Sequence, residues 1–305
     1  MEYINYLIIF LISVIVTYFM IPIAKKLKIV DKPDNELKIH QNAIPYLGGI
    51  AIYLSSIWFI KDIRFIIFGT LMLLLGLLDD IINVSPRFRL INEFIGVVLT
   101  LLPFYNSLGI IYSIILTILG VTLINAVNMI DGMDGICGGN TLFVILFLSI
   151  ISKHFDYIYI VVAILGFLLF NFHPAKIFLG DAGSYFLGYT IFYLTVIMTA
   201  NHGFGGFAIS VIVSALFYTD LFFSFLRRIL NNKSPFSGDR DHIYDKIKKR
   251  YNISVKKTAI ITYIFSFLFG IIGVISWDYP YLGLSLALIE FLFLGIYLKL
   301  YSYKL

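Results

Sequence analysis

Long apolar stretches recur from the beginning to the end of this chain, and they constrain its fold more than any other feature. A helix that crosses a bilayer needs roughly 20 mostly apolar residues. Only 13% of the 305 residues are charged, which is about half of the share found in soluble domains. These properties exclude a soluble globular protein and predict about 11 transmembrane helices, with ten as the alternative count. The predicted spans are 3–24, 44–60, 63–78, 89–105, 107–127, 141–152, 157–172, 183–200, 204–226, 257–276 and 280–300.

The expected fold class is an all-α polytopic membrane protein, because a spanning helix satisfies its backbone hydrogen bonds internally. We predict a single integral membrane domain over residues 1–305, with a long cytoplasmic loop at about 227–256. The first span is not expected to be a cleaved signal peptide, since it lacks a basic start and Lys25 follows it directly. With Cys137 as the single cysteine, an intramolecular disulfide is excluded.

The positions of lysine and arginine predict the orientation of the chain. When loops are assigned to alternate sides, three of the 23 basic residues, Lys61, Arg64 and Lys153, lie on one side and the others on the opposite side. The basic side is expected to face the cytoplasm across the inner (plasma) membrane, with the N-terminus outside and the C-terminus in the cytoplasm. The net charge of +5 is then a topology signal, and nucleic acid is not an expected partner.

The acidic residues and histidines gather in five predicted cytoplasmic loops, at 25–43, 79–88, 128–140, 173–182 and 227–256. These residues are Asp31, Asp34, Asp79, Asp80, Asp131, Asp134, Asp181, Asp239, Asp241, Asp245, His40, His173 and His242. Loops held by a rigid scaffold often carry function, so we predict one site at the cytoplasmic face. The alternative from another class is a carboxylate-lined transporter, which should place its ionisable groups near the midplane of the bilayer.

Two adjacent carboxylates, Asp79 and Asp80, close the third predicted span. Carboxylate oxygens together with substrate phosphates are what Mg²⁺ prefers. A solvated helix end opposite Arg87 and Arg89 is an equally good interpretation of this pair taken alone.

The segment from Asn125 to Gly135 is more specific. Asp131 and Asp134 are three residues apart and share one face of a helical turn, and Asn125 and Asn128 repeat that spacing one turn earlier. Glycines among them would let a ligand approach the backbone closely. We favour a ligand site over a simple polar turn.

A third acidic position, Asp181, starts a span in the segment from Asn171 to Ser184. An N-cap would explain this aspartate by itself, and the other two acidic clusters favour a metal–phosphate site instead. Farther along, Arg240 and His242 have the chemistry to contact phosphate oxygens. Asp220, inside the ninth span, is equally well explained by function or by structure, and Glu290 is interpreted as structural.

Taken together, these motifs resemble the polyprenyl-phosphate N-acetylhexosamine-1-phosphate transferases of glycosyltransferase family 4. That family includes the undecaprenyl-phosphate GlcNAc-1-phosphate transferase and the MurNAc-pentapeptide translocase. The resemblance covers about residues 31–245. Its motifs are Asp31-Lys32-Pro33 with Lys38, His40, Pro45, Gly48 and Gly49; Leu78-Asp79-Asp80; Asn128-Met129-Ile130-Asp131-Gly132-Met133-Asp134-Gly135; Pro174-Ala175-Lys176-Ile177-Phe178-Leu179-Gly180-Asp181; and Ser234-Pro235-Phe236 with Asp239-Arg240-Asp241-His242.

The resemblance implies a phosphotransferase that moves HexNAc-1-phosphate from a UDP-sugar to a polyprenyl phosphate and releases UMP. It implies Mg²⁺ (or Mn²⁺) on Asp181 with Asp79 and Asp80 close by. Asp79 or Asp80 would be the catalytic general base, with Asp79 favoured by the resemblance, or both would act mainly through the metal. His242 would hold the pyrophosphate or the sugar. Substrate contacts are implied for Lys38, Asn128, Asp131, Asp134, Asn171, Phe178 and Arg240, of which Asp134, Asn171 and Phe178 match the positions that hold uridine.

The histidine motif helps to choose a branch of the family. This chain reads His242-Ile243-Tyr244-Asp245 and keeps the first histidine of the motif, while Glu93 stands where the GlcNAc-type enzymes usually have glutamine. The surrounding sequence favours the GlcNAc-like branch. A MurNAc-pentapeptide substrate or another UDP-N-acetylamino sugar is the alternative, and the sequence leaves open the prenyl chain length, the pathway and whether the protein is a homodimer.

Overall fold

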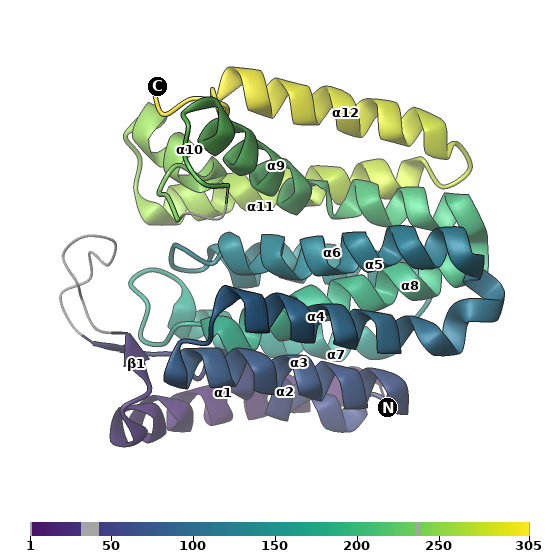
Figure 1. Ribbon diagram of the computed structural model, residues 1–305. Helices are drawn as coiled ribbons and strands as arrows, with labels where there is room; N and C mark the ends of the chain where they lie inside the picture. The colour runs from purple at the N-terminus through teal and green to yellow at the C-terminus, as the bar shows by residue number, and fades with distance from the viewer. Residues whose placement is uncertain (1, 32–42, 236–237, 305) are drawn as a thin grey trace.

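The computed structural model describes residues 2–31, 43–235 and 238–304. The helices lie side by side along a common direction and form a single bundle (Figure 1). A two-residue antiparallel ladder joins Val30–Asp31 (β1) to Ile44–Pro45 (β2). The helices are α1 (Glu2–Leu27), α2 (Gly48–Ser56), α3 (Ile63–Ile82), α4 (Pro86–Leu101), α5 (Tyr105–Met129), α6 (Ile136–Ser152), α7 (Ile158–Asn171), α8 (Gly180–Val213), α9 (Ala215–Leu230), α10 (Ile243–Tyr251), α11 (Val255–Ile275) and α12 (Pro280–Tyr297).

The structure confirms an α-helical, multi-pass membrane protein. Within the described residues, six helical stretches are long and apolar enough to cross a bilayer, and three shorter apolar helices accompany them. The longest stretch, Pro86–Met129, consists of α4 and α5 joined by a short 3-10 turn at Leu102–Phe104. Every predicted span overlaps a helix. By length and composition alone, however, fewer helices than the predicted 11 are long enough to cross a bilayer.

Helix ends follow local signals in the sequence. Asp62 caps α3 by accepting from the backbone N–H of Arg64, and Ser85 caps α4 in the same way, followed by Pro86 at the first helical position. The predicted break between spans at 200–204 corresponds to Gly203, whose φ of 56° interrupts α8. The helix is interrupted again at Ser214, so the predicted span 204–226 is divided between α8 and α9.

Helix α8 is the centre of the bundle, since it is buried along most of its length and packs against α2, α3, α5, α6 and α11. Its contact with α2 is made through Gly49 and Gly183, where a Cβ on Gly49 would overlap the backbone of Gly183. A residue with a side chain at position 49 would therefore prevent this close approach of the two helices. The outer helices instead expose large apolar side chains, such as Leu11 on α1 and Ile289 on α12, which suits contact with lipid.

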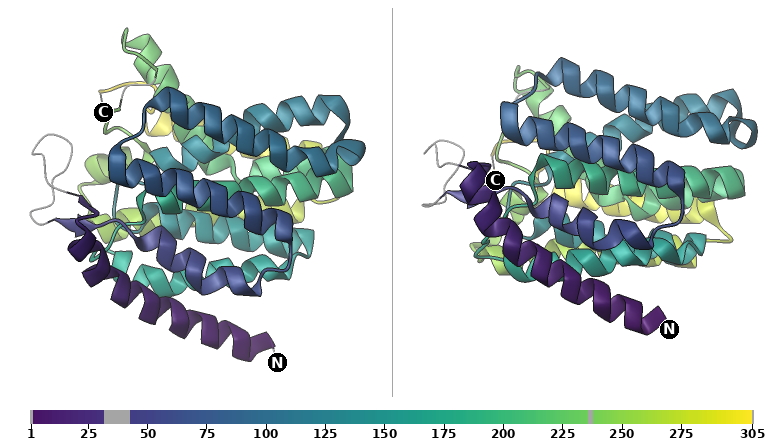
Figure 2. Two further views of the ribbon diagram at one scale, coloured as in Figure 1. Left: turned by 60° about the horizontal axis from the view of Figure 1, so that its bottom comes forward. Right: turned by 90° about the horizontal axis from the view of Figure 1, so that it is seen from below.

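The two ends of the bundle differ. One end carries the β ladder, helix α10 and the C-terminus, and the N-terminus lies at the other end (Figure 1). The further views keep this separation, with α1 at the edge of the bundle (Figure 2). We call the first the loop end. The chain segments around 31, 83, 131, 175 and 240 all reach the loop end, so those acidic residues of the predicted cytoplasmic loops that the structure describes lie at one end of the molecule.

Candidate active site at the loop end

Asp79 lies at the last turn of α3 and is almost fully buried, with 4% of its surface exposed. Its Oδ1 accepts from the backbone N–H of Val84 at 2.8 Å, and its Oδ2 accepts from Nη1 of Arg89 at 2.7 Å. The hydroxyl of Tyr185 on α8 donates to the same Oδ2 at 3.4 Å. Asp79 thus connects α3 to both α4 and α8.

Asp80, the next residue, bonds only to backbone amides within the described part of the chain, whereas Asp79 also bonds to side chains. Its Oδ1 accepts from the backbone N–H of Asp181 at 2.9 Å, and its Oδ2 accepts from that of Ala182 at 3.0 Å. These amides are free donors at the start of α8, where a carboxylate also interacts favourably with the helix dipole. Asp80 therefore caps α8 from another helix, and the capping role considered for Asp181 belongs to Asp80.

Asp181 is held by Asn128, whose Nδ2 donates to Oδ1 at 2.6 Å and also to the Ser184 hydroxyl at 2.9 Å. The carboxyl groups of Asp181 and Asp79 adjoin each other. The structure thus brings together Asp79, Asn128 and Asp181, which come from α3, α5 and α8.

Asp131 and Asp134 lie in the turn between α5 and α6. Oδ2 of Asp134 is 2.7 Å from Nδ1 of His173 and accepts from the backbone N–H of Ala175 at 3.0 Å. Burial, together with the negative charges of Asp181 and Asp134, raises the pKa of Asp131 to about 8. We call Asp79, Asp80, Asp131, Asp134 and Asp181 the aspartate cluster.

Asn171 and Phe178, predicted to contact uridine, come from the segment between α7 and α8. Asn171 is buried and accepts from the backbone N–H of Gly135 at 3.0 Å, while its Nδ2 donates to the Ile177 carbonyl at 2.9 Å. It therefore ties the turn of Asp134 to the segment that carries Phe178. The half-buried Phe178 ring lies 6.4 Å from that of Tyr46.

His242 begins α10 and is nearly buried. Its Nδ1 is 2.6 Å from Oδ2 of Asp220, and its Nε2 is 3.8 Å from Oδ1 of Asp239. Burial by itself lowers the pKa of His242, but Asp220 raises it, with smaller contributions from Asp239 and Asp245. The net shift is upward, so the imidazole keeps its positive charge to a higher pH than an ordinary histidine.

Of the remaining predicted residues, Arg240 is exposed, and its carbonyl accepts from Nζ of Lys249 at 3.0 Å. Lys38 and the neighbouring motif residues of 32–42 lie outside the described residues, as does Phe236. Their predicted roles stay predictions.

Tyr244 joins the two parts of the site. Its ring stacks on His242 with centroids 5.6 Å apart, and its hydroxyl lies against Gly132, where a Cβ would overlap it. The space beside Gly132, which the sequence suggested for a ligand, is therefore occupied by Tyr244. Close by, the Tyr263 hydroxyl donates to the Gly135 carbonyl at 2.6 Å.

Comparisons with known proteins show the family to which this chain belongs. The family model for glycosyl transferase family 4 matches residues 63–199, a range that contains the whole aspartate cluster. An undecaprenyl-phosphate alpha-N-acetylglucosaminyl 1-phosphate transferase from Thermotoga maritima is 33% identical, over 86% of this chain and 87% of the relative. The chain belongs to glycosyl transferase family 4.

Other relatives span two branches of family 4. A probable undecaprenyl-phosphate N-acetylglucosaminyl 1-phosphate transferase from Bacillus subtilis is 29% identical, over 87% of this chain and 83% of its own length. A phospho-N-acetylmuramoyl-pentapeptide-transferase from Dictyoglomus thermophilum is 32% identical, but over only 56% of this chain and 64% of its own length. The longer coverage is with the N-acetylglucosaminyl branch.

The charge of the aspartate cluster fits a divalent cation in this family 4 member. Among the described residues, its five carboxylates bond to one arginine, Arg89, and one histidine, His173. No group of three or more potential metal-ligating side chains in the described residues forms a complete metal site. Mg²⁺ commonly uses one or two carboxylates together with water and substrate phosphates, and the adjoining carboxyls of Asp79 and Asp181 suit that pattern.

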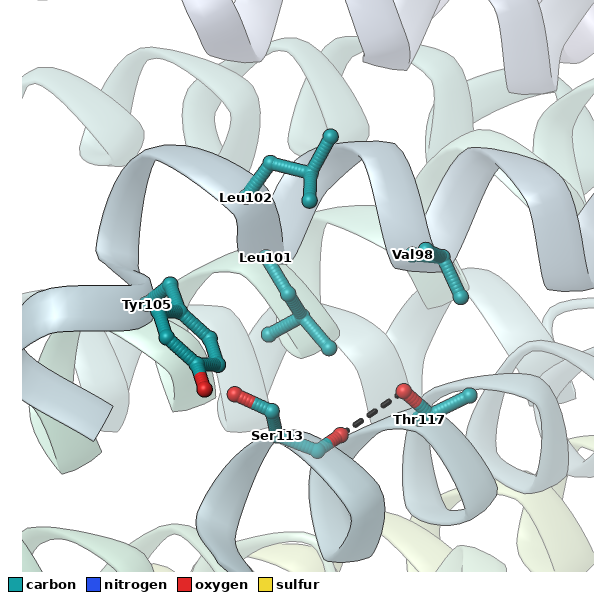
Figure 3. Close-up of a pocket in the computed structure, with 6 residues that line it drawn as sticks. All are labelled: Val98, Leu101, Leu102, Tyr105, Ser113 and Thr117. Atoms are coloured by element: carbon teal, nitrogen blue, oxygen red, sulfur yellow. Dashed lines mark hydrogen bonds between the residues drawn. The ribbon is translucent and has the colours of Figure 1, made fainter. Parts of the chain in front are cut away.

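One cavity adjoins the site, and another lies far from it. One of about 390 Å³ lies between the end of α1, β2 and the end of α3, and its lining includes Lys28, Tyr46, Asp80 and Asn83. The other, of about 70 Å³, lies between α4 and α5 near their connection and is lined mostly by apolar atoms (Figure 3). The polar cavity adjoins the aspartate cluster, and the apolar one is at the opposite end of these helices.

Two partners of the site residues are not apparent from the sequence. Arg89 was considered only in the solvated alternative for Asp79 and Asp80, yet it forms a direct ion pair with Asp79. Asp220 was left undecided, and it holds both the His242 ring and the backbone N–H of Ile243, the latter at 2.7 Å. Its position within an apolar span was the available signal, because a carboxylate there needs a partner.

Proposed function

We propose that this protein transfers HexNAc-1-phosphate from a UDP-sugar to a polyprenyl phosphate, with GlcNAc as the first sugar to test. A phosphate oxygen of the acceptor attacks the β-phosphorus of the UDP-sugar, and the bond from that phosphorus to the bridging oxygen breaks. UMP leaves with the bridging oxygen, and a lipid-linked sugar pyrophosphate remains. The juxtaposition of Asp79 and Asp181 carries the proposal, together with relatives named for this transfer.

The aspartate cluster supports the electrostatic part of this reaction. Phosphoryl transfer depends mainly on positioning and on charge neutralisation. Asp181 with Asp79 would hold Mg²⁺ (or Mn²⁺), which neutralises charge on the pyrophosphate when bound. Asp80 has both oxygens on backbone amides of α8, so we propose that it acts chiefly by fixing Asp181.

Asp79 has two possible roles. As general base, it would remove a proton from the acceptor phosphate. Because the second pKa of a phosphate is near 6, most of the acceptor is ionised at neutral pH, and Asp79 would then act through the metal. The pH profile of Asp79→Asn separates the roles, since activity regained well above pH 7 indicates a base and a uniform loss indicates the metal shell.

The substrate contacts are assigned as follows. Phe178 would stack on uracil, Asp134 and Asn171 would fix the uridine, and Lys38, Asn128, Asp131 and Arg240 would contact the remaining donor groups. The bonds of Asp134 to the His173 segment and of Asn171 to Gly135 and Ile177 support a preformed nucleotide pocket. His242, kept charged by Asp220, would hold the pyrophosphate or the sugar.

We further propose that the loop end faces the cytoplasm, where UDP-sugars are made, and that about 11 helices cross the inner (plasma) membrane. The N-terminus would then be outside and the C-terminus inside, in keeping with the termini at opposite ends of the bundle (Figure 1). A homodimer is one possible assembly. Membership of family 4 argues against the transporter alternative.

The decisive experiment uses the purified full chain in detergent with radiolabelled UDP-GlcNAc, undecaprenyl phosphate and Mg²⁺. We expect a lipid-linked product and release of UMP. A panel with UDP-GalNAc, other UDP-N-acetylamino sugars and UDP-MurNAc-pentapeptide then identifies the sugar. If none of these donors gave a lipid-linked product, the proposed function would be wrong.

A further inference from the structure

The chain after α12 turns back across the loop end. Lys299 has a φ of 50°, its N–H donates to the Ile296 carbonyl at 3.2 Å, and the N–H of Leu300 donates to that of Gly295 at 2.9 Å. This pair of bonds is the Schellman motif that ends many helices with a left-handed residue. We call Leu298–Lys304 the C-terminal tail; its Leu298 and Leu300 are 2% and 1% exposed.

Two basic side chains hold the backbone of the C-terminal tail. Nη1 of Arg227, on α9, donates to the Leu300 carbonyl at 2.7 Å, and Nζ of Lys246, on α10, donates to the Ser302 carbonyl at 2.6 Å. Both residues are fully or almost fully buried, at 1% and 0% exposed. Hydrogen bonds from charged donors in a buried setting are strong, so the tail is held against both α9 and α10.

Tyr303 reaches from the tail to Asp239. Its hydroxyl donates to Oδ2 of Asp239 at 3.0 Å, and Nζ of Lys233 lies 4.1 Å from the centroid of its ring. Asp239 also pairs with Arg227 at 3.0 Å and with Arg228 at 3.2 Å. The position of Asp239 is thus set by α9 and by the tail together.

Asp239 in turn faces His242. Its Oδ1 is 3.8 Å from Nε2 of the imidazole, and Asp220 lies at the opposite nitrogen. Asp245, from α10, accepts from the backbone N–H of His242 at 3.3 Å. The imidazole therefore lies between a carboxylate from α9 and one from the segment before α10, and the second of these, Asp239, accepts a hydrogen bond from Tyr303.

We infer that Tyr303 and the C-terminal tail are a positioning device for the reaction, because they hold Asp239 and, through it, His242. The inference rests on the proposed function, in which His242 contacts the pyrophosphate or the sugar. In this inference Tyr303 is a positioning residue that acts through its bond to Asp239. Its effect on turnover must therefore pass through His242.

The test is a double-mutant cycle on kcat, measured with the full chain by the radiolabel assay. Tyr303→Phe removes the hydroxyl and keeps the ring over Lys233, and we expect kcat to fall about 3- to 10-fold, the size of one lost hydrogen bond. Tyr301→Phe, two residues away and exposed, is the matched control and should leave kcat unchanged. In a His242→Gln background, Tyr303→Phe should have no further effect, because coupled residues are not additive.

Equal fold-losses in both backgrounds would show that Tyr303 acts independently of His242 and would overturn the inference. A loss of kcat that follows a lowered thermal unfolding midpoint would do the same, since it would indicate general loosening. The inference would also be overturned if the kcat of Tyr303→Phe were the same as that of Tyr301→Phe. A wild-type chain that is inactive with every donor would contradict the proposed function instead, which keeps the two failures distinguishable.

Discussion

The aspartate cluster and the histidine segment, residues 238–246, lie at the same end of the bundle and balance their charges in opposite ways. Within the described part of the histidine segment, Asp239 pairs with Arg227 and Arg228, and Asp241 pairs with Lys246 and Lys249. The aspartate cluster has Arg89 and His173 against five carboxylates. The protein itself neutralises the paired carboxylates of the histidine segment. The aspartate cluster keeps unbalanced negative charge, which a bound cation and substrate would neutralise.

The two regions are therefore expected to contribute differently to stability and to turnover. A buried carboxylate with matched cations is costly to disturb but needs nothing from outside. Carboxylates that adjoin each other without matched cations favour a bound proton or metal. We therefore expect substitutions of the charge-paired Asp239 and Asp241 to lower stability and substitutions in the aspartate cluster to lower turnover. The following predictions test that contrast in order of expected effect.

The largest effect is expected for Asp181→Asn. Removing a charge from the cation position should lower kcat by about 1,000-fold or more, with little change in the thermal unfolding midpoint. Asp156→Asn, at the opposite end of the bundle, is the matched control. Restoration of wild-type rates at high Mg²⁺ would show that Asp181 has a merely structural role.

Asp239→Asn should produce the opposite pattern. It leaves Arg227 and Arg228, which are 1% and 3% exposed, without their counter-charge. Breaking a buried pair in this way costs about 3–5 kcal/mol, so the unfolding transition in detergent should move to clearly lower denaturant or temperature. An Asp239→Asn variant as stable as wild type would contradict the view that this segment is held by charge pairing.

The junction between the two regions can be tested at Gly132. Gly132→Ala should place a methyl group on the Tyr244 hydroxyl, and such overpacking costs about 1–3 kcal/mol. Tyr244→Phe removes the hydroxyl, so the double variant should recover most of the lost stability, as measured by thermal unfolding. Additive losses in the double variant would mean that the two residues do not meet.

The smallest effect is expected for Tyr263→Phe. This change removes the hydrogen bond to the Gly135 carbonyl, beside the turn that carries Asp134. A single neutral hydrogen bond contributes about 0.5–1.5 kcal/mol. We expect a slight loss of unfolding free energy and a kcat within about threefold of wild type. A large loss of kcat would contradict this prediction, because it would show that the turn carrying Asp134 depends strongly on the bond from Tyr263 on α11.

Much of this protein was predictable from its sequence. The spans follow from apolar length, which is a local property, and each overlaps a helix. The acidic motifs and their order predicted family 4 through their resemblance to the motifs of that family. The helix starts at Asp62 and Ser85 were also local, since a cap acts within its own turn.

The partners of these residues were decided only by the tertiary structure. Asp79 and Asp80 are neighbours in sequence, but successive residues of a helix point about 100° apart, so Asp79 meets Arg89 while Asp80 meets the start of α8. Asp220 and His242 are joined across 22 positions, and Tyr303 reaches Asp239 across 64. Such contacts depend on how helices pack against one another, and no local pattern in the chain specifies which side chains will meet.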